Sequence, residues 1–207
     1  MTVEHRSLTG SQLHEPKGVD APASAGTFAF ISSGATSWGS LIGSTSATAS
    51  TSSELTFTDL ANYNMVRLTF VNLLRATASS TLRMRLSTNN GSSYSSSSIY
   101  NTLYYDTASL ITGTGSTSYF DICGAQTQLY TNGVVELYNL NPTAIETNGI
   151  GTIVASTAAS GSGTPLVSRF NLCLDNGTLD AHNAIRIYSS SGNLTSGTVY
   201  LEGFKGT

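Results

Sequence analysis

The stretch spanning residues 184–204 most constrains the fold of this chain, because apolar and polar residues alternate along it with a period of two. The first run ends in a cluster of Ser, Gly and Asn at 189–193, and Val199 and Leu201 then resume the alternation. Such alternation is typical of strands with one buried face, and turn residues between two runs indicate a hairpin. The sequence therefore predicts a half-buried hairpin whose last strand closes a sheet.

The same period recurs in short segments along most of the chain. In the clearest one, Leu82, Met84 and Leu86 alternate with polar residues, and Asn90-Gly91 follows as a typical turn dipeptide that predicts a hairpin with the next strand. Further strands are expected at 64–72, 118–123, 133–140, 149–155 and 167–175. No segment shows the period and caps of an amphipathic helix. About nine short strands of this kind predict an all-β protein, an antiparallel β-sandwich of jelly-roll-like type.

Composition divides the chain into three regions. Residues 1–26 are polar, irregular and interrupted by Pro and Gly, which predicts an extended N-terminal arm. Residues 27–53 are expected to be a transitional segment that ends in a Ser/Thr-rich linker at 43–53. Residues 54–207 are then the β-sandwich domain, and they are numerous enough to bury an independent core.

Charge and hydropathy argue against several classes of partner. Only 10% of the residues are charged and the net charge is −3, so the chain lacks the basic surface that nucleic acid requires. No apolar run is long enough to span a membrane, and the N-terminus lacks the apolar segment of a secretory signal. We expect neither a nucleic acid nor a membrane partner, and exposure outside a cell would have to come from assembly into a particle.

The residue pattern contains no constellation that indicates catalysis. There is no G-x-S-x-G motif, and His182 is the only histidine outside the arm, in a loop where a solvated or turn-capping role is expected. The carboxylates are scattered, and the segment 175–180 lacks the spacing of a calcium loop. On the arm, His14 and Glu15 have no third ligand nearby. The sequence predicts a non-enzymatic protein without metal or cofactor.

The two cysteines, Cys123 and Cys173, each lie in an apolar, strand-like run. We expect both to be buried free thiols, because no dense cysteine framework is present. A disulfide between them stays open as the alternative.

Several short strings resemble parts of tailed-bacteriophage virion proteins. LHEPKG on the arm resembles an N-terminal segment of head-fibre, decoration and tail-fibre proteins. RMRLSTNNGSSY at 83–94, AIRI at 184–187 and SSGNLTSGTV at 190–199 resemble a β-rich module of phage head and tail proteins. The resemblance implies a virion component made in the host cytoplasm, often a homotrimer, that docks on other capsid or tail proteins. The anchoring residues would be Leu13, His14, Glu15, Pro16, Lys17 and Gly18.

Four arginines fall on strand faces opposite the aliphatic ones. Arginine pairs with carboxylates through two hydrogen bonds and stacks on tyrosine, so we expect these faces to be subunit contacts, with simple solvent exposure as the alternative. The four are Arg67, Arg83, Arg85 and Arg186.

A second function class also remains open, that of a module on a phage fibre that binds a host carbohydrate or receptor. Tyrosines interleaved with Ser and Asn make adaptable binding surfaces, although packing in the core or between subunits is the alternative. The single tryptophan fits a core anchor, an interface residue or a sugar-stacking platform. The candidate glycan contacts are Trp38, Tyr94, Tyr100, Tyr104 and Tyr105.

Overall fold

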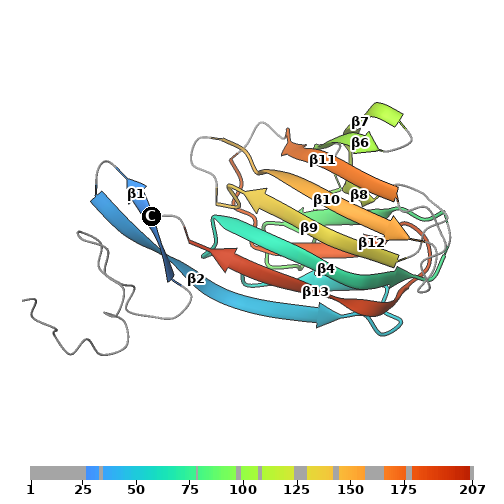
Figure 1. Ribbon diagram of the computed structural model, residues 1–207, viewed down its shortest axis with the longest axis horizontal. Coiled ribbons are helices and arrows are strands. Elements are labelled where there is room, and N and C mark those ends of the chain that lie inside the picture. Colours follow the sequence, from blue (N-terminus) through green and yellow to red (C-terminus); the bar gives the residue numbers. More distant parts are fainter. Residues whose placement is uncertain are drawn as a thin grey trace, which may run out of the picture.

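The computed structural model describes residues 27–32, 35–77, 79–96, 99–106, 109–123, 130–141, 145–156, 166–175 and 179–205. These residues form two antiparallel sheets that pack against each other (Figure 1). The nine-stranded sheet consists, in order, of β1 (Thr27–Ser32), β2 (Ala35–Thr48), β13 (Leu194–Phe204), β4 (Met65–Arg75), β9 (Tyr130–Tyr138), β10 (Asn148–Ser156), β11 (Leu166–Leu174), β6 (Tyr100–Asp106) and β7 (Ser109–Thr117). The four-stranded sheet consists of β3 (Glu54–Phe57), β12 (Ala184–Ser189), β5 (Leu82–Ser87) and β8 (Phe120–Cys123).

The strand order is that of a jelly roll with additions. In the small sheet, β3, β12, β5 and β8 lie side by side although they come from distant parts of the chain. In the large sheet, β2, β13, β4 and β9 keep the matching jelly-roll order. Strands β10, β11, β6 and β7 extend the sheet beyond β9, and β1 extends it beyond β2. The predicted all-β, jelly-roll-like sandwich is confirmed, whereas the predicted arm at 1–26 lies outside the described residues.

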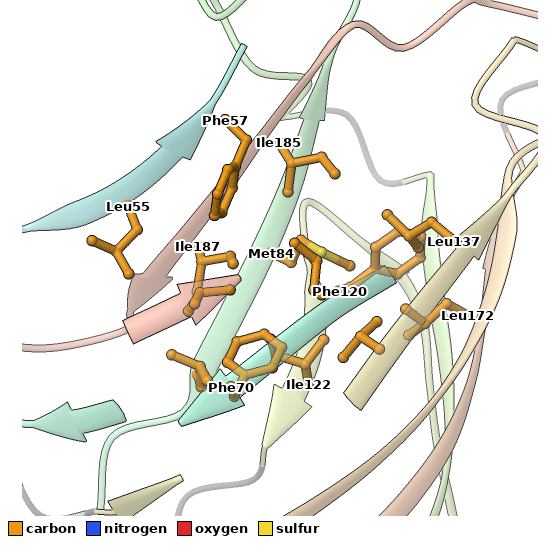
Figure 2. Close-up of a cluster of buried hydrophobic side chains, with 14 of the residues drawn as sticks. Leu55, Phe57, Phe70, Met84, Phe120, Ile122, Leu137, Leu172, Ile185 and Ile187 are labelled. Carbon is orange, nitrogen blue, oxygen red and sulfur yellow. The ribbon is translucent and has the colours of Figure 1, made fainter. Parts of the chain in front are cut away.

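The hydrophobic core fills the space between the sheets (Figure 2). The small sheet contributes residues such as Met84 and Ile187, and the large sheet contributes Phe70 and Leu137. The predicted Leu82, Met84 and Leu86 face is fully buried in this core. Burial of apolar area is the main stabilising term of such a sandwich.

Two predicted hairpins are wrong, although their strands exist. Strand β12 pairs with β3 and β5, whereas β13 pairs with β2 and β4, so the chain crosses from one sheet to the other between them. Likewise, Asn90 and Gly91 have the positive φ angles of a tight turn, but the next strand, β6, lies beside β11 in the large sheet. Alternation fixes which side of a strand is buried. It does not fix whether the following strand pairs with it or faces it across the core.

The predicted linker at 43–53 is in part a strand. Residues 43–48 belong to β2 and pair with β13, for example Thr45 with Leu201. An edge strand needs a partner for its backbone groups more than it needs apolar side chains, so a Ser/Thr-rich segment can serve. The earlier half of β2 pairs with β1, and this hairpin extends beyond the end of the sandwich (Figure 1).

The two cysteines differ in burial. Cys123 is buried as predicted, but Cys173 is exposed, and both are free thiols. Residues Leu172 and Leu174 point into the core, so the period of two directs Cys173 to the outer side of β11. The expectation of two buried thiols is therefore corrected for Cys173.

Candidate functional site

The sandwich has two outer faces, one on each sheet, and the four predicted arginines are divided between them. Arg83 and Arg85 of β5 and Arg186 of β12 lie on the small sheet, whereas Arg67 of β4 lies on the large sheet. All four alternate with buried residues, which is why they point outward.

Arginines and tyrosines stack on the outer face of the small sheet. The guanidinium carbon of Arg83 lies 3.7 Å from the ring centre of Tyr119, and that of Arg186 lies 4.4 Å from the ring of Tyr94 and 5.0 Å from the ring of Tyr188. Contacts of this kind are cation–π interactions. Burial under these stacks raises the pKa of both Tyr94 and Tyr188.

The same arginines also have polar partners within the chain. Arg83 Nε lies 3.2 Å from Asp121 Oδ1, and Arg186 Nη1 lies 3.1 Å from Glu54 Oε2. Arg85 Nε donates a hydrogen bond of 2.7 Å to the backbone oxygen of Ser118. The tyrosine and carboxylate partners that were expected across a subunit boundary are thus supplied by the chain itself. A role in subunit contacts stays a prediction for these residues.

A charged network lies in the middle of the outer face of the large sheet. Arg67 donates to Glu136 Oε1 through Nε at 2.9 Å and through Nη2 at 2.7 Å, and its Nη1 lies 3.9 Å from Glu202 Oε2. The hydroxyl of Tyr138 donates to the other oxygen of Glu136. The hydrogen bond from Tyr138 and, to a smaller extent, those from Arg67 hold the pKa of Glu136 below its usual value. Burial and the bond to Glu136 raise the pKa of Tyr138 to about 12.

Apolar side chains surround this network on the same outer face. Among the described residues, seven large hydrophobic side chains are exposed, and five of them point outward from this one sheet. The five are between 36% and 49% exposed: Val71, Leu103, Ile150, Val154 and Tyr200. This surface was not predicted from the sequence. The sequence feature that indicates this surface is the run 149–155. Ile150 and Val154 lie on one side of the strand and Ile153 lies on the other, so both sides carry apolar residues.

A shallow depression of about 450 Å³ lies on this face over β9, β10 and β11. Val134 and Ile150 give it apolar walls, whereas Thr152, Arg169 and Asn171 give it polar ones. Arg169 is exposed and forms no ion pair with any other residue that the structure describes. The lining of the depression therefore combines apolar side chains with one guanidinium group that is not used in an ion pair within the described residues.

The predicted glycan contacts do not come together as a site. Tyr100 is fully buried, with its ring centre 4.8 Å from that of Phe120, so it cannot contact a glycan and that prediction is corrected. Tyr94 is half-buried beneath Arg186. The side chains of Trp38, Tyr104 and Tyr105, and the whole of the predicted anchor Leu13–Gly18, lie outside the described part of the chain.

His182 is a buried structural residue rather than a solvated one. Its Nδ1 lies 3.0 Å from the hydroxyl of Thr147, which in turn donates to the backbone oxygen of Asn139. Burial lowers the pKa of His182 to about 4, so the ring is neutral near pH 7. The expected solvated or turn-capping role is thus replaced by one that joins two loops at the end of the sandwich.

The sequence matches no family model and no curated protein. Within the described ranges, no helix is long and apolar enough to cross a membrane. Those same residues contain no group of three or more His, Cys, Asp or Glu side chains arranged to hold a metal ion. The features that bear on function are therefore the two outer faces and the short strings that resemble phage proteins.

Proposed function

We propose that this chain is a non-enzymatic structural component of a bacteriophage particle, docked through residues 1–26 and displaying the jelly-roll sandwich. The observation that carries the proposal is how the described ionisable side chains are used. Arg67, Glu136 and Tyr138 bind one another, and the arginines of the small sheet bind tyrosines, carboxylates and backbone. These contacts stiffen the outer faces and leave the exposed apolar side chains of the large sheet available for packing against protein.

The electrostatics of the described groups favour a structural role over acid–base catalysis. A general acid or base needs a pKa near the working pH and access to its substrate. The pKa of Glu136 is lowered by its bonds to Tyr138 and Arg67, and the neutral ring of His182 is buried beneath loops. The resemblance of LHEPKG to phage arms and the jelly-roll order, an architecture used by viral capsid proteins, add support by analogy.

The anchoring role is tested by two truncations that differ only in the LHEPKG string. Particles are assembled with the full chain, with a chain lacking residues 1–12, and with a chain lacking residues 1–18. We expect the first truncation to be incorporated and the second to remain unattached, with both folded by circular dichroism. Normal incorporation of the chain lacking residues 1–18, seen by cryo-electron microscopy of the particles, would show that the string is not the anchor.

A host carbohydrate-binding module is the second candidate, and the depression on β9–β11 is the observation that favours it. Thr152, Arg169 and Asn171 offer hydroxyl, guanidinium and amide groups beside apolar side chains, which is the usual make-up of a small-ligand site. A glycan array probed with the full chain and with Asn171→Ala tests this. Binding that the substitution abolishes would support the module, and the absence of any bound glycan would contradict it.

A further inference from the structure

We propose that two copies of this chain pair through the outer face of the nine-stranded sheet, related by a two-fold axis that runs along β9. Such pairing would not depend on which particle or surface the chain joins. Five of the seven large hydrophobic side chains that are exposed among the described residues lie on this one face. Exposed apolar side chains gathered on one face of a protein indicate an interaction site.

The strand order makes the face symmetric about β9. Strands β4 and β10 flank β9, and β13 and β11 lie one strand further out on either side. A two-fold axis along β9 would lay β4 of one copy over β10 of the other, and β13 over β11. A closed dimer needs this kind of self-complementary patch, in which each residue meets the symmetry equivalent of its partner.

The apolar residues match under this operation. Val154 of β10 pairs with Asn132 of β9. The side-chain oxygen of Asn132 accepts a 2.8 Å hydrogen bond from the backbone nitrogen of Asn72, which follows Val71 on β4. Val71 and Val154 thus lie at the same height on opposite sides of β9. The two-fold axis would bring Val71 of each copy against Val154 of the other copy.

The charged and aromatic residues match as well. Cross-strand pairing runs in one row from Tyr200 on β13 through Thr69, Val134 and Thr152 to Arg169 on β11. Val134, on β9, is the middle of this row and would meet its own copy at the axis. Tyr200 of one copy would then face the guanidinium of Arg169 of the other, which has no ion-pair partner among the described residues of its own chain.

The overall charge of the face also favours a second copy as the occupant. Arg67 and Arg169 balance Glu136 and Glu202, and the outermost charges, Glu202 and Arg169, lie at opposite ends. The operation that superposes β13 on β11 places Glu202 over Asn171, two residues along β11 from Arg169, so that the long side chains of Glu202 and Arg169 can approach each other. An axis along β9 keeps the central strands of the two copies parallel, which lies within the range of strand angles found when sheets pack face to face.

The test is the mass of the full chain in solution, measured by sedimentation equilibrium from about 1 to about 100 µM. Ile150→Glu places a charge in the proposed interface. Ile145→Glu is the matched control, because Ile145 is 65% exposed in a loop outside the face. We expect a dimer that Ile150→Glu weakens by roughly tenfold or more and that Ile145→Glu leaves unchanged. Both positions are exposed, so thermal melts of the two variants should match the parent chain when all three are measured at a concentration low enough to keep them monomeric.

A charge exchange gives a second readout that a folding defect would not reproduce. Arg169→Glu should weaken the dimer, and adding Glu202→Arg to it should restore association. A monomer at the highest concentration would overturn the proposal. So would a trimer or a dimer that Ile150→Glu does not weaken. A monomer whose binding to a glycan is lost in Ile150→Glu would overturn it in favour of a ligand site.

Discussion

Replacing Leu86 by alanine is the sharpest test of how the sandwich is held together. Leu86 is fully buried on β5, which lies between β12 and β8 in the middle of the small sheet. Its backbone nitrogen donates to the hydroxyl of Tyr100, which fixes the strand against the opposite sheet. A strand held on both sides cannot move to fill a cavity.

The expected cost follows from that immobility. Leucine-to-alanine changes in cores cost about 2 to 5 kcal/mol, and the upper part of that range applies where the surroundings cannot collapse. We therefore expect Leu86→Ala to lower the free energy of unfolding by about 3 to 5 kcal/mol. The neighbouring Arg85→Ala removes an outward hydrogen bond to Ser118 and should cost about 1 kcal/mol.

Urea unfolding followed by circular dichroism measures both changes. The slope with urea should be equal in the parent chain and the two variants, so that the midpoints report stability alone. A loss below about 1 kcal/mol for Leu86→Ala would refute the assignment of the inner and outer sides of β5. A loss for Arg85→Ala that exceeds the loss for Leu86→Ala would refute it as well.

Three further results are expected. Gly151→Ala should destabilise the chain by about 1 to 3 kcal/mol in the same urea assay, because a Cβ at residue 151 would lie 2.3 Å from the ring of Phe170; an unchanged midpoint would mean that the ring is placed otherwise. The pKa of His182 is lowered in the folded state, so its stabilising contribution is present above about pH 6.5 and is lost as the pH falls toward 4; an NMR titration midpoint near 6.5 for its ring would contradict this. Cys173 should react with a maleimide in the folded protein, whereas Cys123 should react only after unfolding, and equal labelling would contradict their different burial.

Period-two alternation was sufficient to predict the fold class and the sides of the strands. It placed Leu82, Met84 and Leu86 inside, and it placed Arg83 and Arg85 on the other side of the same strand. These features depend only on the direction of successive side chains, which the local backbone determines. They can therefore be read from a single segment.

Neighbour relationships could not be predicted in the same way. The pairing of β12 with β3 and β5 depends on segments that lie roughly a hundred residues or more apart in the sequence, and no local pattern distinguishes it from a hairpin with β13. The strand character of residues 43–48 was hidden because it comes from backbone pairing with β13 rather than from apolar side chains. Tyr100 was misplaced for a related reason, since its burial against Phe120 depends on contact between the two sheets.

The pairing at the end of β13 determines which strand ends lie together at one pole, that is, one end of the sandwich. Thr27 pairs with Ser40, and Phe204 pairs with the adjacent Leu41. The beginning of β1 and the end of β13 therefore lie at the same pole. The opposite pole is built from turns that are tied together through backbone bonds, from Ala49 to Gly197 and from Ala76 to Asn193. Whatever holds the chain near Thr27 would therefore present those Ser/Thr-rich turns outward, and a peptide tag inserted there would report which way the molecule points.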